Sequence, residues 1–271
     1  MASCEQAADN FYEDESPDYS VYGSMAVGES ENYIRVMDVN QPHIEDSTGK
    51  ADVTVRFKDL TNNETELLED TLIGFDDFLT QNFKVNTPIR SNHVYRVSVD
   101  NGTQKPLTTV ATAPGNTELR TTRSSPPQCS EKLQWDFHNV SSAENIHLEV
   151  GLPYNDDIRW AHVGGNCSDV EHLEDRDIWR LTAHVYELFQ YHFPASDPCT
   201  GPSVTCSDLD KDEIYLHYFH LGAEYEHYYK SEEPVDPAES PTIENGIGFL
   251  GVHHEHYSTF AIDTSEANQP H

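Results

Sequence analysis

The sequence predicts an all-β protein, in which a small antiparallel β-sandwich is followed by a second antiparallel β-rich domain that carries one short helix. Three observations support this prediction. Apolar and polar residues alternate with period two over many short segments, turn-forming residues separate these segments, and helical periodicity is rare. The chain has 271 residues, which is enough for two domains that each bury a core.

The first half of the chain shows the clearest alternation. In the segment 52–58, Val53, Val55 and Phe57 share one face, which is typical of a half-buried antiparallel strand. The turn residues Asn101 and Gly102 predict a hairpin between the segments on either side. The strands expected in this half are 19–26, 32–39, 52–58, 65–68, 94–99 and 107–113.

These strands predict a sandwich over residues 18–114, and the Pro114-Gly115 pair marks a domain boundary. The second β-rich domain is expected over residues 115–264. Residues 1–17 are acidic and polar and are expected to form a tether, while residues 265–271 form a tail. The strands expected in the second domain are 117–122, 132–138, 146–152, 158–163 and 214–221, and a longer apolar and aromatic stretch spans 178–193.

The period changes after this last strand. Tyr225, Tyr228 and Tyr229 recur at helical spacing, so a short helix is expected over residues 223–231. Three prolines in residues 232–241 predict a loop. A final hairpin of residues 246–252 and 257–262 closes the chain.

Glycines alternate with apolar residues at the start of this hairpin, where residues 245–252 read Asn-Gly-Ile-Gly-Phe-Leu-Gly-Val. Such a pattern indicates that one backbone approaches another closely, because glycine has no side chain to obstruct the approach. Gly246, Gly248 and Gly251 are therefore interpreted as structural glycines. They do not form a phosphate-binding loop, because no Lys-Ser or Lys-Thr pair follows them.

The charge of the chain limits its partners. Asp and Glu total 48 against 16 Lys and Arg, which gives a formal net charge of −32. Phosphate binding needs clustered cations, so nucleic acid is excluded as an expected partner. The acids are spread along the chain and predict a solvated surface. A high-salt habitat would suit such a surface because salt screens its self-repulsion.

The N-terminus predicts export and a lipid anchor. Met1-Ala2-Ser3-Cys4 is similar to the end of a bacterial lipoprotein signal, in which small residues precede the lipidated cysteine. Cys4 is therefore the expected lipidation site. We expect that the apolar part of the signal was removed and a Met added. The alternative is a free cysteine near the start of the chain.

An even number of cysteines remains, and in an exported chain it predicts two disulfides with three possible pairings. Cys199 and Cys206 flank a Gly-Pro turn and form the bridge that closes most easily, which leaves Cys129 to pair with Cys167. A zinc site is the alternative, although six residues between two cysteines is not the spacing of a zinc knuckle.

The histidines at positions 253, 254 and 256 form the clearest candidate binding site in the sequence. On a strand, His254 and His256 would project from one face, and His253 would project from the other with Glu255. Two imidazoles at this spacing can share a zinc or copper ion. His217 and His220 could supply a further ligand if their strand packs nearby. The alternative is that the histidines cluster by chance, and no cofactor is otherwise expected.

Aromatic residues offer a second candidate site. Trp135, Trp160 and Trp179, together with Tyr154, could line a ligand groove. Trp135 and Trp179 lie in alternating apolar segments, so the core is the expected place for these two. No nucleophile elbow or other enzyme motif is present in the sequence, so catalysis is not expected.

Several motifs give the chain a resemblance to a known family. The segment 242–251 resembles the C-terminal Asn-(x)-Gly-Gly-Leu-Gly-x-Phe-Gly signature of the domain-of-unknown-function 4249 family, which comprises lipoproteins of Bacteroidota. Tyr22-Gly23 with 33–36, and 94–99 with Thr109–Pro114, resemble other strands of that family. The resemblance covers nearly the whole chain, but this chain has Leu250 where the family often has Phe.

The resemblance implies an immunoglobulin-like N-terminal domain and an outer-membrane lipoprotein that accompanies a TonB-dependent receptor. It supplies no catalytic residues. The predicted function is therefore that of an exported, lipid-anchored binding or accessory protein at the cell surface or the periplasmic face of the outer membrane, and not of an enzyme. The alternatives are a divalent-metal-binding surface protein that uses residues 253–256, and a hydrolase that acts on glycans.

Overall fold

The computed structural model describes residues 18–40, 51–75, 78–102, 105–121, 132–142, 145–154, 157–163, 168–184, 213–225 and 242–261. Nearly all regular structure within these ranges is β-strand, and the strand pairs are antiparallel in β1–β2, β11–β15, β3–β7 and β7–β8. The prediction of an all-β protein is therefore confirmed. No helix within the same ranges has the length and apolar character that a membrane span needs.

The chain divides into two compact units. Unit 1 comprises residues 1–89, 93–112 and 227–251, and unit 2 comprises residues 90–92, 113–226 and 252–271. The main division follows Thr112, close to the predicted boundary at residue 114. The structure differs from the prediction near the C-terminus, because residues 242–251 belong to unit 1 and not to the second domain.

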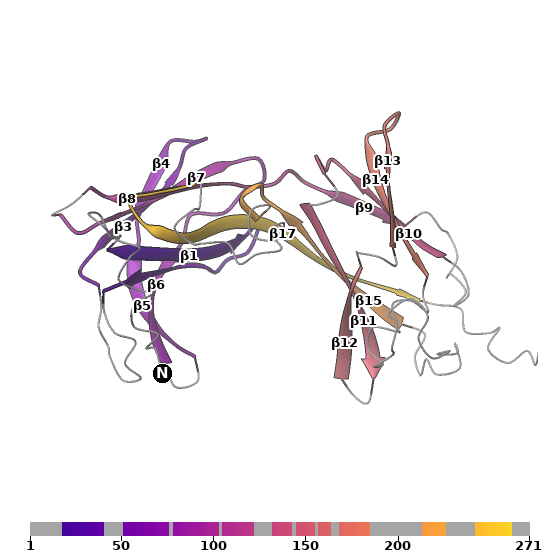
Figure 1. The fold of residues 1–271 in the computed structure, drawn as a ribbon, viewed down its shortest axis with the longest axis horizontal. Coiled ribbons are helices and arrows are strands. Elements are labelled where there is room, and N and C mark those ends of the chain that lie inside the picture. The colour runs from indigo at the N-terminus through magenta and orange to yellow at the C-terminus, as the bar shows by residue number, and fades with distance from the viewer. Residues whose placement is uncertain are drawn as a thin grey trace, which may run out of the picture. The chain divides into compact units, whose positions relative to one another are not determined.

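Unit 1 contains two sheets (Figure 1). One sheet has the order β17-β1-β2-β6-β5 and the other has the order β16-β8-β7-β3-β4. Alternating side chains such as Val21, Ile34, Phe57 and Val97 are fully buried in this unit. The strands are β1 Tyr19–Ala26, β2 Asn32–Asp38, β3 Thr54–Asp59, β4 Glu64–Leu67, β5 Glu69–Phe75, β6 Phe78–Val85, β7 Val94–Asp100, β8 Leu107–Thr112, β16 Ile243–Glu244 and β17 Ile247–Ala261.

Strand β17 meets β1 with little space between the two backbones. Gly248 has φ +126°, and a Cβ atom on it would lie 2.0 Å from the carbonyl oxygen of Val21. A Cβ on Gly246 would lie 2.0 Å from Cδ1 of Leu107, and Gly251 is buried further along β17. Only glycine fits at position 248, because both the φ of Gly248 and the nearby Val21 carbonyl exclude a side chain.

Unit 2 is a second sandwich. One of its sheets has the order β12-β11-β15-β17, in which β17 contributes its residues from Val252 onward, and the other has the order β13-β14-β10-β9. The strands are β9 Glu118–Thr121, β10 Lys132–His138, β11 Ile146–Tyr154, β12 Asp157–Val163, β13 Ser168–Leu173, β14 Ile178–His184 and β15 Glu213–Leu221.

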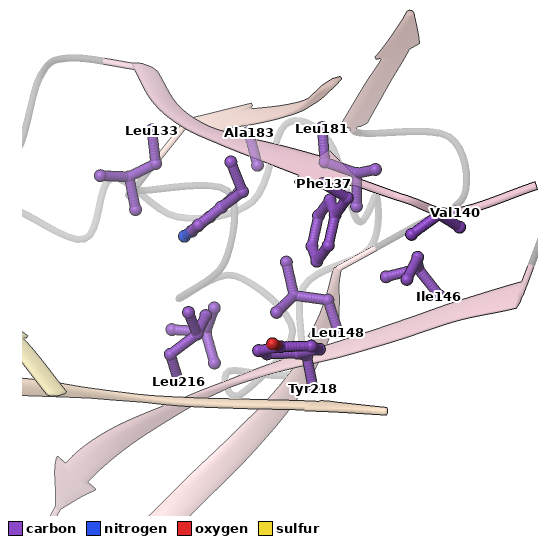
Figure 2. Packing of buried hydrophobic residues seen from close by; sticks show 11 residues of the cluster. Leu133, Phe137, Val140, Ile146, Leu148, Leu181, Ala183, Leu216 and Tyr218 are labelled. Atoms are coloured by element: carbon purple, nitrogen blue, oxygen red, sulfur yellow. The ribbon is translucent and has the colours of Figure 1, made fainter. Parts of the chain in front are cut away.

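Alternate side chains of the two sheets in unit 2 meet in one hydrophobic core (Figure 2). Strands β10 and β14 supply one side of this core, and β11 and β15 supply the other. Trp135 is only 1% exposed, as its alternating segment predicts, and Trp179 packs against the cluster while partly buried. The cluster comprises Leu133, Trp135, Phe137, Val140, Ile146, Leu148, Val150, Leu181, Ala183, Leu216 and Tyr218.

The predicted final hairpin is wrong, because β17 runs without a turn from Ile247 to Ala261 and pairs with β15 along its second part. The predicted helix over 223–231 falls mostly outside the described residues. So do the tether, the tail and all five cysteines, namely Cys4, Cys129, Cys167, Cys199 and Cys206.

Candidate functional site

The histidine-rich part of the chain lies where β15 pairs with β17 in unit 2. His220 lies opposite His254, and Tyr218 lies opposite His256. Because Tyr218 belongs to the hydrophobic core, these four side chains belong to the inner face of the sheet. The intervening residues belong to the outer face, and they are His217, Phe219, His253, Glu255 and Tyr257.

His217 occupies the centre of the outer face between two carboxylates. Its Nε2 atom lies 2.8 Å from Glu255 Oε1, and its Nδ1 atom lies 3.3 Å from Glu149 Oε2. Strand register explains the contact, because Glu149 on β11 lies directly opposite His217. When both ring nitrogens are protonated, each donates to one carboxylate, so the charged imidazole satisfies both acids.

Aromatic rings surround this polar centre. His217 stacks on Tyr257 with centroids 3.9 Å apart, and the edge contact with Trp160 has a centroid distance of 5.5 Å. Trp160 lies over Gly151, where a Cβ would come within 2.8 Å of the indole. Trp160 is 38% exposed and Tyr257 is 66% exposed. We call the group of Glu149, Trp160, His217, Phe219, Glu255 and Tyr257 the outer platform.

Hydrogen bonds on the outer platform set the protonation of its acids. Burial opposes ionisation of Glu255, but hydrogen bonds from the Tyr257 hydroxyl and from His217 outweigh burial and lower the pKa of Glu255. Partial burial and the same contact with Glu255 raise the pKa of Tyr257 to about 12. Glu255 is therefore an anion and Tyr257 a neutral donor at neutral pH.

His253 lies beside the outer platform and is more enclosed. Its Nδ1 atom is 3.2 Å from the hydroxyl of Tyr225, and its ring makes an edge contact with Phe219. Burial lowers the pKa of His253, even though Glu255 nearby favours the charged ring. His253 therefore serves as a neutral packing and hydrogen-bonding group.

On the inner face, His220 is held by the segment that precedes β9. Its Nδ1 atom lies 3.1 Å from the carbonyl oxygen of Gly115 and also contacts the hydroxyl of Thr117. A carbonyl oxygen only accepts, so Nδ1 carries the proton that it donates. Burial lowers the pKa of His220 to about 4, so the ring is neutral at neutral pH.

His254 and His256 differ from the other histidines in their hydrogen bonding. The Nδ1 atom of His254 and the Nε2 atom of His256 are buried without a hydrogen-bond partner in the structure of the described residues. The two rings are tilted, with centroids 4.3 Å apart, and His256 also stacks on Tyr218. Burial lowers the pKa of both imidazoles. Repulsion from His256 and His253 lowers the pKa of His254 further.

The structure therefore separates the histidines that the sequence grouped. His220, His254 and His256 lie on the inner face, while His217 and His253 lie on the outer face, so one ion cannot contact all five. Among the described residues, no group of three or more His, Cys, Asp or Glu side chains is arranged to hold a metal ion. The proposed disulfide cysteines lie outside those residues.

Sequence reasoning missed the outer platform as a unit. Trp160 was a candidate ligand-contacting residue, but its partners Glu149, Phe219 and Tyr257 were not. The signal was present in the alternation of β15, where His217 and Phe219 share one face and Tyr218 and His220 the other. The strand register across β11, β15 and β17 was needed to join these residues.

Comparisons with known proteins add little to this geometry. No protein-family model matches the chain, and no curated protein matches it. Among solved structures, a marsupial T cell receptor matches with 9% identity and a TM-score of 0.25, over 88% of this chain and 73% of the receptor chain. A likeness of this size supports no statement about ligand or activity.

Proposed function

We propose that this is an exported, lipid-anchored surface protein that acts by binding, and that the outer platform is the surface that contacts its ligand. The observation that carries the proposal is the exposure of Trp160 and Tyr257 beside a fixed polar centre. Cys4 would supply the anchor, and a TonB-dependent receptor in the outer membrane is the partner that the sequence resemblance favours.

The aromatic side chains of the outer platform are held in place before any ligand arrives. The ring of Tyr257 stacks on His217, and its hydroxyl donates to Glu255 at 2.8 Å. The indole of Trp160 packs closely over Gly151, which has no side chain to displace it. Ordering such rings in advance lowers the entropy cost of binding, and Trp and Tyr are the side chains enriched at binding hot spots.

Binding fits this geometry better than hydrolysis does. A glycoside hydrolase needs one carboxylate as acid and another as nucleophile or base, on either side of the bond to be cleaved. Glu149 and Glu255 instead share one imidazole, and Glu255 also accepts from Tyr257. Both acids are thus occupied in holding the outer platform together.

Photo-crosslinking in intact cells of the source organism tests the ligand-contacting surface. A benzophenone amino acid replaces Tyr257 in the full-length protein, and the matched control places it at Leu67 in unit 1, which is 64% exposed. We expect a discrete adduct at position 257 that is absent at position 67. A Trp160→Ala change should abolish that adduct, whereas Val170→Ala on β13 should leave it intact. Identical adducts at positions 257 and 67 would reject the outer platform.

The lipid anchor is tested separately. Cys4→Ser in the full-length gene product should move the protein from the membrane fraction to the soluble fraction, and globomycin should block maturation of the unaltered protein. Unchanged fractionation and processing would remove the anchor from the proposal and leave the binding surface to be judged by the crosslinks.

A further inference from the structure

We infer that the inner face of the β15–β17 pair binds a transition-metal ion such as Zn²⁺ or Cu²⁺ through the imidazoles of His254 and His256. This site is distinct from the outer platform, because it lies on the opposite face of the same sheet. It rests on two buried ring nitrogens, Nδ1 of His254 and Nε2 of His256, for which the structure of the described residues shows no hydrogen-bond partner.

Buried nitrogens without partners are uncommon in folded proteins, and each requires a physical explanation such as a water molecule or an ion. Here two of them occur on neighbouring rings of one strand face. The ring centroids of His254 and His256 lie 4.3 Å apart. Imidazole nitrogens bind zinc at about 2.0–2.1 Å, so two nitrogens on one ion lie within about 4 Å of each other. The centroid separation places the two rings close enough to share one ion.

The surroundings keep these imidazoles in the form that binds metals. A metal ion takes the neutral ring, and burial lowers the pKa of both His254 and His256. Tyr218 stacks on His256 with its centroid 4.9 Å away and restricts rotation of that ring. Both side chains are partly exposed, while the two nitrogens without partners are covered.

His220 is the neighbouring histidine on the same face, but it is not a third ligand in this structure. It lies opposite His254 in the register, and its Nδ1–H donates to Gly115. The lone pair of a ring in this tautomer is on Nε2, and a histidine whose other nitrogen donates to a backbone carbonyl is the usual form of a metal ligand. In the present arrangement the three histidines do not form a complete three-residue metal group. The ion therefore has two protein ligands, with its other positions taken by water.

The outer-face histidines do not compete for this role. Both ring nitrogens of His217 face carboxylates, and His253 contacts the Tyr225 hydroxyl. A pure nitrogen donor pair suits zinc, copper and nickel, and the general order of affinity places Cu²⁺ above Zn²⁺. Two protein ligands make an exchangeable site and not a closed structural one, because a structural zinc site uses four.

Calorimetric titration of the full chain with Cu²⁺ and with Zn²⁺ tests the inference. The sequence holds 15 histidines, so the measured quantity is the difference between variants. The double variant His254→Gln/His256→Gln should lose one equivalent of bound metal, and each single variant should weaken that equivalent by at least about tenfold. The control, His217→Gln/His253→Gln, changes two histidines on the opposite face of the β15–β17 pair and should keep that equivalent of metal. Unchanged stoichiometry in the His254/His256 variant would overturn the inference.

A measurement on the unaltered protein covers the case in which the variants fold poorly. Diethylpyrocarbonate modifies accessible neutral imidazoles, and peptide mapping by mass spectrometry locates the modified residues. Added Zn²⁺ should protect His254 and His256 severalfold while leaving His172 on β13 reactive. Equal reactivity of His254 and His256 with and without the metal would also overturn the inference.

Discussion

His217 stacks face to face on Tyr257, with ring centroids 3.9 Å apart and ring planes 11° apart, although Tyr257 is 66% exposed. Strand register produces this contact, because the two residues lie directly opposite each other on β15 and β17. The phenol is fixed at its other end by Glu255, to which the hydroxyl donates at 2.8 Å. An exposed aromatic ring held at both ends is suited to contact a ligand with little loss of entropy.

The contact with Glu255 should be visible in the titration of Tyr257, whose pKa is raised to about 12. In Glu255→Gln the acceptor charge disappears, so the neutral phenol is less favoured and the pKa of Tyr257 should fall toward the ordinary value of about 10. Tyr218, whose pKa is raised to about 12 by burial alone, is the internal control and should not change. Carbon-13 NMR of labelled tyrosines measures both residues, and an unshifted Tyr257 would contradict the assigned hydrogen bond.

Gly248 should be the least replaceable glycine of unit 1. Alanine there would adopt φ +126° and place its Cβ 2.0 Å from the Val21 carbonyl oxygen, so β17 would have to leave β1. We expect Gly248→Ala to lower the free energy of unfolding by more than about 3 kcal/mol. Gly28→Ala is the matched control, because Gly28 has φ +82° but a Cβ atom on it would meet no other atom within 4 Å. This control substitution should lower the free energy of unfolding by only about 1–2 kcal/mol.

Amide hydrogen exchange followed by mass spectrometry reports this difference in the strands of unit 1. Gly248→Ala should accelerate exchange throughout β1 and β17, whereas Gly28→Ala should act near its own turn. Equal effects of the two substitutions would show that the close approach of the β17 and β1 backbones is not what requires glycine at this position.

Asp59 should make unit 1 sensitive to acid. It is fully buried, its carboxylate accepts from the backbone N–H groups of Thr61 and Asn62, and it lies 2.8 Å from Nδ1 of His93. Burial opposes ionisation, but these contacts outweigh burial and lower the pKa of Asp59 below 3.8. A depressed folded-state pKa stabilises the fold above the unfolded-state value, and this stability is lost as the pH falls through the folded-state value.

The variant Asp59→Asn should therefore be less stable than the parent at pH 7 by about 2 kcal/mol, and the difference should shrink below about pH 4. Hydrogen exchange in β3 and β7 across this pH range measures the effect. Asp52→Asn changes an exposed acid of the same unit and should leave the pH dependence of stability unaltered. A stability difference for Asp59→Asn that does not depend on pH would contradict the role of its charge.

Alternation predicted the strands whose two faces differ in polarity. Residues 19–26 were predicted as a strand and form β1, and the alternation of Val55 and Phe57 correctly placed both side chains in a core. Strands β5, β6 and β13 were missed because polar or charged residues occur on both of their faces, so a clear period of two is not visible. Their pairing is decided by neighbouring strands and not by their own pattern.

The candidate site was predictable only in part, because it depends on register. The sequence correctly assigned His254 and His256 to one face of a strand and His253 to the other. It did not show that β17 would continue through residues 253–256, because a hairpin of residues 246–252 and 257–262 was predicted. The contacts of His217 with Glu149 and Tyr257 join three strands that are far apart in the sequence, and no local pattern contains that information.

Arg180 and Asp136 form a cross-strand pair on β14 and β10 that should resist conservative replacement. The guanidinium donates from Nε to Oδ1 at 2.7 Å and from Nη2 to Oδ2 at 2.8 Å, and both side chains are mostly buried. Lysine cannot form both bonds, so Arg180→Lys should destabilise unit 2 by about 1 kcal/mol. All three tryptophans lie in unit 2, so their fluorescence in urea measures this change.

The control for this pair is Arg120→Lys. Arg120 makes a similar two-bond contact with Glu118, but both side chains are more than half exposed, so water replaces the lost bond. We expect no measurable shift of the unfolding midpoint for Arg120→Lys. Equal shifts for the two substitutions would show that burial does not distinguish the two pairs.

His220 should give unit 2 a pH dependence of its own in mildly acidic solution. Its pKa is about 4 in the folded protein, against an ordinary value of 6.5 that applies after unfolding. Between these values the unfolded chain binds a proton that the folded chain does not, so stability falls as the pH drops from about 6.5 toward 4 and is constant above that window. The contribution of one such shift is of the order of 3 kcal/mol.

The variant His220→Gln keeps a polar side chain for Gly115 and Thr117 but does not titrate. Its unfolding by urea, followed by tryptophan fluorescence, should depend less on pH between 6.5 and 4 than that of the parent. Some dependence should remain, because burial also lowers the pKa values of His253, His254 and His256. An unchanged slope would mean that His220 takes up a proton as readily in the folded protein as in the unfolded chain, which would contradict the lowered pKa.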